Sequence, residues 1–162
     1  MAFFRVADYS HVVRDAPDDM VRYRALMHDL PRRFHQLSRD LQARALRDPA
    51  PLTGTAWDAL LAAVVEHIAR LHRHGIPDWT EEPERFLDPP WVIPVFPDMA
   101  RESVLFAPAA FVRHGAFPDL SSLDARGGER HTWAPSRDGY GWPYPNCEKN
   151  RPRPRVRDGG HS

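Results

Sequence analysis

The stretch Trp57-Asp-Ala-Leu-Leu-Ala-Ala-Val-Val-Glu-His-Ile-Ala-Arg-Leu71 decides the fold of this chain. Its apolar residues recur at the i, i+3, i+4 and i+7 positions that form one broad face of an α-helix. Thr55 and Asp58 resemble a capping box at its start, and Gly75 fits the position just after a helix end. We therefore predict a central helix over 56–74 whose wide apolar face packs in the core.

Proline and acidic residues before this stretch indicate two further helices. Pro17 is followed by two aspartates, as is typical of a helix start, and apolar residues then recur at helical spacing up to Leu30. Pro31 lacks a backbone N–H, so we expect it to stop or kink this helix. A second helix is predicted over 31–47. The first sixteen residues fit either a short strand or an arm that packs elsewhere.

Residues 76–97 combine six prolines with four large aromatic residues. The prolines limit regular structure, because each lacks a donor and restricts the residue before it. The aromatic rings argue against free disorder, because rings of this size are normally buried. We expect a long ordered connection held against the helices, with at most a short helix near 81–87. Two short helices should follow, one capped by Asp98 and one opened by Pro108.

The composition changes after residue 125. Residues 126–162 contain eight basic and four acidic residues, and since the whole chain has zero net charge, about −4 remains on the rest. Six glycines and five prolines leave this segment little to pack, so we predict that it is flexible alone and ordered on a partner. The predicted organisation is an N-terminal arm over 1–16, an all-α domain over 17–125 and an irregular tail over 126–162.

The overall composition is that of an ordinary globular protein. The chain has 162 residues, of which 42% are apolar and 27% charged. No apolar run approaches the roughly 18 residues of a membrane span, and the N-terminus lacks the apolar region of a signal peptide. The single cysteine, Cys147, excludes an intrachain disulfide. We expect a cytoplasmic protein that does not associate with membranes.

No group of residues has the spacing of an active site, so we predict no catalytic residues, no metal ligands and no cofactor. Glu66-His67 is followed by His72 and His74, but a helical zinc site needs two histidines at i and i+4 with a glutamate between them. We interpret these as histidines at a helix end. The carboxylates of 81–88 are interpreted as a solvated acidic turn.

Arg126 and His131 have the spacing found in a family of helical ribonucleases, the HEPN fold. The two glycines between them disfavour the helix that such chemistry needs. A ribonuclease or a metal-dependent enzyme is therefore the second alternative for function.

The segment Arg151-Pro-Arg-Pro-Arg-Val-Arg157 is the sharpest feature of the tail. Its prolines keep the chain extended, so four guanidinium groups are presented along a rod, those of Arg151, Arg153, Arg155 and Arg157. The planar fork of arginine suits phosphate or carboxylate surfaces. We predict contact with a nucleic-acid backbone or an acidic protein groove. The alternative is a solvated tail shaped by codon usage.

Three stretches together resemble a helical module of high-GC bacteria: 57–67, 77–91 and 107–115. This module often follows a helix-turn-helix domain in regulator or antitoxin-like proteins, which are similar to partners of nucleotidyltransferase-type toxins. The resemblance covers about 55–120, and its motifs concern packing, so it implies no catalytic residue. Leu30-Pro31 departs from the continuous turns of a compact helix-turn-helix, which argues against DNA reading and leaves a protein-binding role open.

We therefore predict a non-enzymatic interaction protein, antitoxin-like or regulatory, that binds a partner protein. Trp79, Phe86 and Trp91 are the predicted partner face, because aromatic residues dominate interface hot spots. The alternative role of these three side chains is to cover the helical core. The first alternative function is a DNA-binding regulator that uses the tail and the arginine-rich helix predicted over 31–47.

Overall fold

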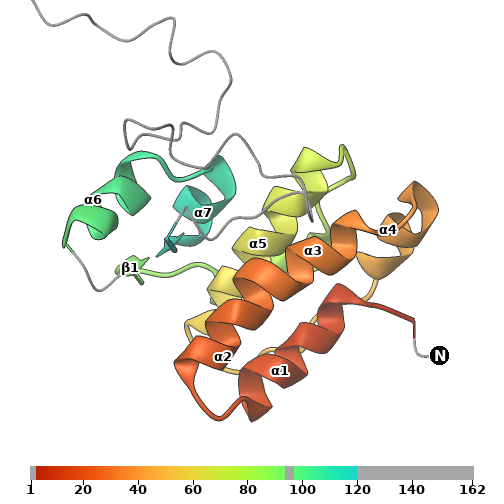
Figure 1. Cartoon of the computed structure of the whole chain (residues 1–162), viewed down its shortest axis with the longest axis horizontal. Coiled ribbons are helices and arrows are strands. Elements are labelled where there is room, and N and C mark those ends of the chain that lie inside the picture. Colours follow the sequence, from red (N-terminus) through yellow and green to blue (C-terminus); the bar gives the residue numbers. More distant parts are fainter. Residues whose placement is uncertain (1–2, 94–96, 120–162) are drawn as a thin grey trace, which may run out of the picture. The chain divides into compact units, whose positions relative to one another are not determined.

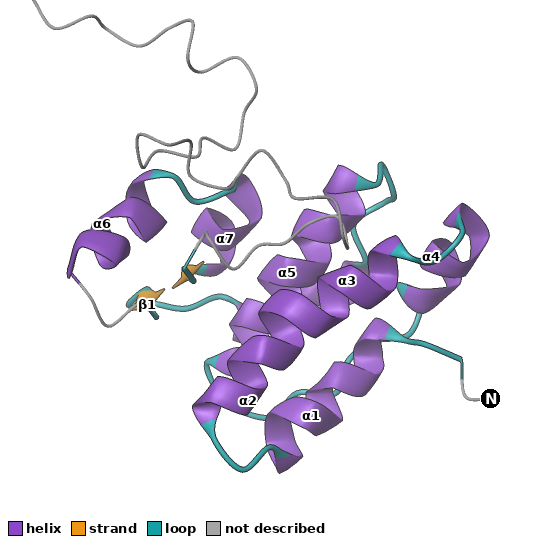
Figure 2. Cartoon of the chain, viewed as in Figure 1, coloured by secondary structure: helices purple, strands orange, loops and turns teal. Residues whose placement is uncertain are grey.

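The computed structural model describes residues 3–93 and 97–119, and it confirms the predicted all-α class (Figures 1 and 2). The helical elements in chain order are the 3-10 turn η1 (Val6–Asp8), α1 (Tyr9–Asp15), α2 (Asp19–Arg24), the π-turn η2 (Ala25–Asp29), α3 (Leu30–His35), α4 (Arg39–Ala45), α5 (Trp57–Leu71), the 3-10 turns η3 (Asp78–Glu81) and η4 (Pro83–Arg85), α6 (Pro97–Leu105) and α7 (Ala109–His114). Two short strands complete the described part, β1 (Trp91–Val92) and β2 (Ala116–Phe117).

Helix α5 is the central element, as its apolar stripe predicts. It packs against α1, α3 and α7, and most of its residues are buried. The buried residues are Trp57, Asp58, Ala59, Leu60, Leu61, Ala62, Ala63, Val64, Val65, Glu66, Ile68 and Ala69. A helix that is apolar on nearly every side belongs inside a core, and the neighbouring helices surround it accordingly.

The predicted capping box at the start of α5 is only half right. The N-cap residue is Ala56, and Thr55 does not cap the helix with its side chain. The Asp58 carboxylate instead reaches back and accepts backbone N–H bonds from Thr53, Gly54 and Thr55 at 2.8 to 3.3 Å. One acidic side chain in the first turn therefore orders residues 53–55, the end of the preceding loop.

The end of α5 differs from the prediction that placed Gly75 after the helix. The residue in the left-handed region is Arg73, with φ 57°, whereas Gly75 has no positive φ. The Arg39 guanidinium donates to the carbonyl oxygens of His72 and Arg73, both at 3.2 Å. These bonds satisfy carbonyl groups that a helix end leaves open, and they support the left-handed turn of a residue other than glycine.

Pro31 does not stop the helix in which it lies. Helix α2 begins at Asp19, where the Asp18 side chain accepts the N–H of Val21, and the chain continues through η2 into α3 (Figure 1). A proline cannot donate to the carbonyl four residues earlier and its ring crowds that carbonyl. The wider turn of η2 lies directly before α3, so the helix accommodates Pro31 by a local π-turn.

The single helix predicted over 31–47 is wrong, because the chain breaks between α3 and α4. Helix α3 ends at His35, and Ser38 has extended backbone before α4 begins at Arg39. The Gln42 side-chain amide donates to the carbonyl oxygen of Phe34 at 3.2 Å, which compensates for the lost helical bond. The N-terminal segment, for which a strand or an arm was expected, is a helix, α1, that packs on the core.

The proline-rich connection is ordered over its described residues, as predicted, and contains η3 and η4. It then pairs as β1 with β2 in parallel, with Trp91 opposite Ala116 and Val92 opposite Phe117. Helix α7 follows Pro108, as predicted, and is closed by Gly115 at φ 68°. Helix α6 begins at Pro97, so Asp98 lies in its first turn and is not the cap. No helix in the described part is both long and apolar enough to span a membrane.

Candidate functional site

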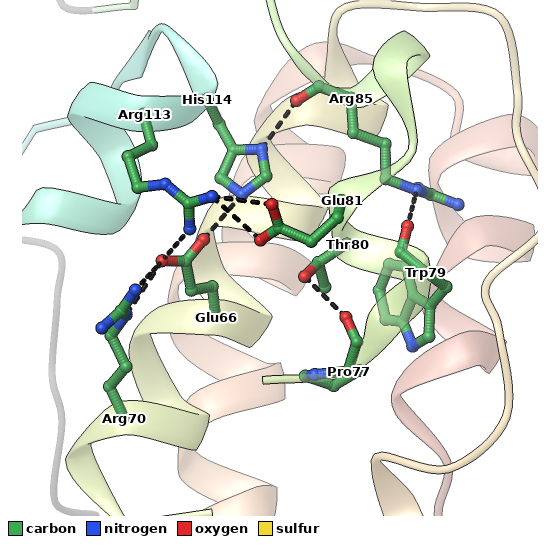
Figure 3. A network of polar contacts seen from close by, with 9 residues as sticks. All are labelled: Glu66, Arg70, Pro77, Trp79, Thr80, Glu81, Arg85, Arg113 and His114. Carbon is green, nitrogen blue, oxygen red and sulfur yellow. Dashed lines mark hydrogen bonds and ion pairs between the residues drawn. The ribbon is translucent and has the colours of Figure 1, made fainter. Parts of the chain in front are cut away.

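Glu66, a buried carboxylate on α5, connects the three stretches of sequence that carry the resemblance, 57–67, 77–91 and 107–115. The Glu66 side chain is fully buried, and its Oε1 atom accepts hydrogen bonds from Arg70 Nε at 2.9 Å and Arg113 Nη1 at 2.7 Å. Its Oε2 atom lies 2.9 Å from His114 Nε2 (Figure 3). Burial raises the pKa of Glu66, but the hydrogen bonds from Arg113, Arg70 and His114 outweigh this effect and hold the pKa below its ordinary value.

His114 is also fully buried, and both of its ring nitrogens face acceptors. Nδ1 donates to the carbonyl oxygen of Arg85 at 2.7 Å, which assigns a proton to that nitrogen. Nε2 faces the Glu66 carboxylate. A bare ring nitrogen and an ionised carboxylate would repel each other at this distance, so one proton lies between them. The imidazole therefore joins α7 to α5 and to the end of η4.

Arg113 extends this network to the solvent-exposed side. Its Nη2 atom contacts both carboxylate oxygens of Glu81, at 2.7 and 3.0 Å, while Nη1 holds Glu66. Glu81 belongs to η3, so one guanidinium connects α7, α5 and the proline-rich connection (Figure 3). The hydrogen bonds that Arg113 donates to Glu81 and to Glu66 raise the pKa of Arg113, and the bond to Glu81 has the larger effect.

The buried side chain of Arg85 holds the proline-rich connection in place. Its side chain is fully buried, and Nε donates to the carbonyl oxygen of Trp79 at 3.0 Å and to Glu82 Oε2 at 2.9 Å. Nη2 donates to the carbonyl oxygen of Ala50, and the guanidinium lies 4.6 Å from the centre of the Trp79 ring. Arg85 thereby fixes the loop before α5 against η3 and η4.

The three residues of the predicted partner face all take part in this intramolecular packing. Trp79 is only 7% exposed and lies under Arg85. Phe86 is half-buried and stacks on His114, with ring centres 4.5 Å apart, and Trp91 is half-buried edge-on against Trp57 at 5.0 Å. These contacts favour the alternative that they cover the helical core. Whether a partner also touches Phe86 or Trp91 stays a prediction.

Sequence reasoning missed a group of exposed aliphatic side chains on β1, α6 and α7. We call this group, whose members are each exposed on adjoining elements, the aliphatic face. Its members, with their exposed fractions, are Val92 (38%), Val104 (44%), Leu105 (66%) and Val112 (53%). Helix α6 contacts β1 and β2, and α7 contacts β2, so the three elements are neighbours. The run Val104-Leu105-Phe106 was the signal, because consecutive apolar residues at the end of a helix cannot all point into the core.

The histidines and carboxylates that were weighed as metal ligands have other surroundings. His67 packs against Phe111 with ring centres 5.6 Å apart, and burial lowers the pKa of His67 to about 4. Glu81 and Glu82 pair with Arg113 and Arg85. Within residues 3–93 and 97–119, no group of three or more histidine, cysteine or acidic side chains is arranged to hold a metal ion.

The arginine-rich region 31–47, the basis of the DNA-binding alternative, is largely engaged in contacts within the protein. Arg32 and Arg33 lie 2.9 and 3.7 Å from Asp29, Arg39 holds the end of α5, and Arg44 lies over an aromatic ring of the N-terminal segment. These contacts do not favour DNA reading by this region. The tail arginines, Arg151, Arg153, Arg155 and Arg157, and the Arg126–His131 pair lie outside the described residues.

Comparisons of this chain with models of protein families, with curated proteins and with solved structures found no match.

Proposed function

We propose that this chain is a non-enzymatic component that binds a partner protein through its aliphatic face, in the antitoxin-like or regulatory role that the resemblance over 55–120 implies. The observation that carries this proposal is the exposure of Leu105 and Val112, each more than half accessible, on neighbouring helices. Burial of such side chains in an interface is favourable by roughly 25 cal/mol for each Å² removed from water.

Helix α6 is built in a way that supports this role. Its buried residue is Ser103, while the aliphatic Val104 and Leu105 that follow are exposed. A helix of this length is not stable in isolation, and α6 buries little of its own apolar surface against the protein. A protein partner that covers Val104 and Leu105 would supply the burial that α6 otherwise lacks.

The buried network gives this face a firm support. Val112 is adjacent to Arg113, which ties α7 to α5 and η3, and His114 ties the same helix to Glu66. A surface held in one conformation loses less entropy when it binds, so a preorganised face supports tighter association. The network also connects the three stretches that carry the resemblance, because Glu66 lies in 57–67, Arg85 in 77–91 and His114 in 107–115.

The test is co-purification of the tagged full chain from a high-GC bacterial host, followed by reconstitution with the isolated partner. The double variant Leu105→Ser/Val112→Ser should fold, with unchanged helical circular dichroism, and should weaken partner binding at least tenfold. The matched control Met20→Ser/Leu52→Ser removes exposed apolar side chains from outside the face and should bind normally. Recovery of the chain alone, or equal binding by both double variants, would contradict the proposal.

A further inference from the structure

The charges of the described residues are divided unevenly between two parts of the chain. Residues 78–119, which carry the aliphatic face, contain eight acidic and three basic residues, so their net charge is −5 with histidine counted as neutral. Residues 3–77 contain nine acidic and eleven basic residues, a net charge of +2. A protein that approaches the aliphatic face therefore meets predominantly negative charge, which steers association and selects partners by the sign of their own charge.

Three carboxylates of this acidic part are left for an outside partner. The glutamates of η3 and of the residue after it are held by arginines within the protein. By contrast, Asp88, Asp98 and Glu102 are exposed, and none of them forms an ion pair among the described residues. Arg101 is the one arginine of 78–119 in the same situation within that part of the structure. Three carboxylates against one guanidinium favour a partner of positive charge.

Two of these carboxylates share the exposed side of α6 with an aliphatic residue. Asp98, Glu102 and Leu105 follow one another at spacings of four and three, which places them on one side of a helix. All three are exposed, Leu105 by 66%, whereas Ser103 is on the buried side. Asp88 lies three residues before β1, which α6 contacts. The most exposed side chain of the aliphatic face is therefore bordered by carboxylates.

The strands beside α6 offer a partner little backbone to pair with. β1 and β2 are each two residues long, and they already pair with each other. In the sequence, Pro89 and Pro90 precede β1 and Pro94 follows it, and a proline has no N–H to donate. A third strand would gain few backbone hydrogen bonds here. Docking by side chains is favoured instead, and an amphipathic helix presents aliphatic side chains at i, i+3, i+4 and i+7 for this purpose.

From this combination we infer that the partner segment that covers α6 is a basic amphipathic helix. Its aliphatic side chains pack on Val104 and Leu105, and its lysine or arginine side chains pair with Asp98 and Glu102. An acidic helix with the same apolar pattern would bring like charges together, which weakens binding and selects against such a partner. This inference rests on the proposed function, to which it adds the class of the partner.

The first experiment compares two synthetic peptides of about 18 residues, or five helical turns. Both have leucine at i, i+3, i+4 and i+7, and the remaining positions carry lysine in one peptide and glutamate in the other. Binding to the full chain is followed through the ¹³C-methyl signals of Val104 and Leu105. The basic peptide should give saturable shifts that weaken as salt rises from about 50 to about 300 mM, and the acidic peptide should bind at least tenfold more weakly. Equal binding of the two peptides, or tighter binding of the acidic one, overturns the inference.

Two double variants of equal charge show whether the carboxylates of α6 make this selection. Asp98→Asn/Glu102→Gln should weaken binding of the basic peptide about fivefold, because two pairing sites are lost. The matched control Asp15→Asn/Asp40→Asn removes the same charge from exposed positions on α1 and α4 and should leave binding unchanged. Both should keep the helical circular dichroism of the natural chain. If the two double variants bind the peptide alike, the inference is wrong.

Binding of the co-purified partner separates this inference from the proposed function. If Leu105→Ser/Val112→Ser weakens that binding but Asp98→Asn/Glu102→Gln does not, the aliphatic face is the interface and the basic character of the partner is wrong. If neither double variant weakens it, the proposed function fails as well. Contacts of the Leu105 methyl groups with a second copy of the chain, or with residues 126–162, in the chain alone would identify another occupant and overturn the inference.

Discussion

Glu66 and His114 are 48 residues apart in the sequence, yet their side chains meet at 2.9 Å and both are fully excluded from solvent. His114 also donates through Nδ1 to the carbonyl oxygen of Arg85, so each polar atom of its ring has a partner. A buried charge is tolerated only when its hydrogen bonds are complete, and this contact therefore fixes the relative positions of α5, α7 and the end of η4.

The replacement Glu66→Gln should destabilise the protein by about 3 kcal/mol, because it removes the negative charge that holds Arg113 and His114. Urea unfolding followed by circular dichroism measures this free energy. Glu84→Gln is the matched control, because Glu84 is exposed and forms no ion pair within the described residues. A loss below about 0.5 kcal/mol in Glu66→Gln would mean that the network contributes little to stability.

His67 should make the protein less stable as the pH falls from about 6.5 to about 4. Burial lowers the pKa of His67 to about 4 in the folded state, so between these pH values the unfolded chain binds the proton and the folded chain does not. Protonation therefore favours unfolding, by up to about 1.4 kcal/mol per pH unit. Urea unfolding at several pH values measures the slope.

The variant His67→Gln cannot titrate and should show a shallower loss of stability over the same pH range. Replacing the exposed His11 by glutamine is the control, and it should leave the slope close to that of the natural chain. Equal slopes in His67→Gln and in the natural chain would show that His67 is protonated as readily in the folded as in the unfolded state.

Arg85→Lys should destabilise the protein by about 2 kcal/mol although it preserves the charge. A lysine has one nitrogen in place of the separate Nε and Nη2 atoms that reach the carbonyl oxygens of Trp79 and Ala50, and it offers the indole a point charge in place of the guanidinium. Thermal unfolding measures the effect, with Arg101→Lys at an exposed position as control. Identical melting temperatures for the two variants would contradict a special role of the guanidinium.

The sequence predicted the fold correctly where a single local pattern of residues determines the structure. The apolar stripe of α5 is wide and continuous, so its helix and its burial followed directly. Of the two outcomes expected for Pro31, a stop did not occur, because the rule for proline is local, whereas Leu26, Leu30 and Phe34 on both sides are fully buried and hold the helix together through the π-turn. The break before α4 was hidden because the apolar spacing runs through it.

The candidate site was harder to predict from the sequence, because its contacts join segments that are far apart in the chain. Glu66 stands between the buried Val65 and Ile68, and a carboxylate within an apolar stripe is a signal for a buried polar network. The partners Arg113 and His114 lie almost fifty residues further on, and no spacing rule connects them to Glu66. Trp79, Phe86 and Trp91 of the connection were correctly expected to be ordered, but nothing local distinguishes packing on Arg85 or His114 from exposure to a partner.

Gly115→Ala should destabilise the protein by about 2 kcal/mol or more, because two penalties act at the same residue. Gly115 has φ 68°, in the region that residues with a Cβ avoid, and an added Cβ would lie 2.7 Å from the backbone oxygen of Leu87. That oxygen belongs to the proline-rich connection, which pairs with β2 beside it, so only a shift of the backbone would relieve this close contact.

Gly75→Ala is the matched control, because Gly75 has no positive φ and open space where a Cβ would lie. Urea unfolding should place Gly75→Ala within about 1 kcal/mol of the natural chain, on either side. Equal stabilities of the two alanine variants would show that α7 and the connection can move apart at no cost.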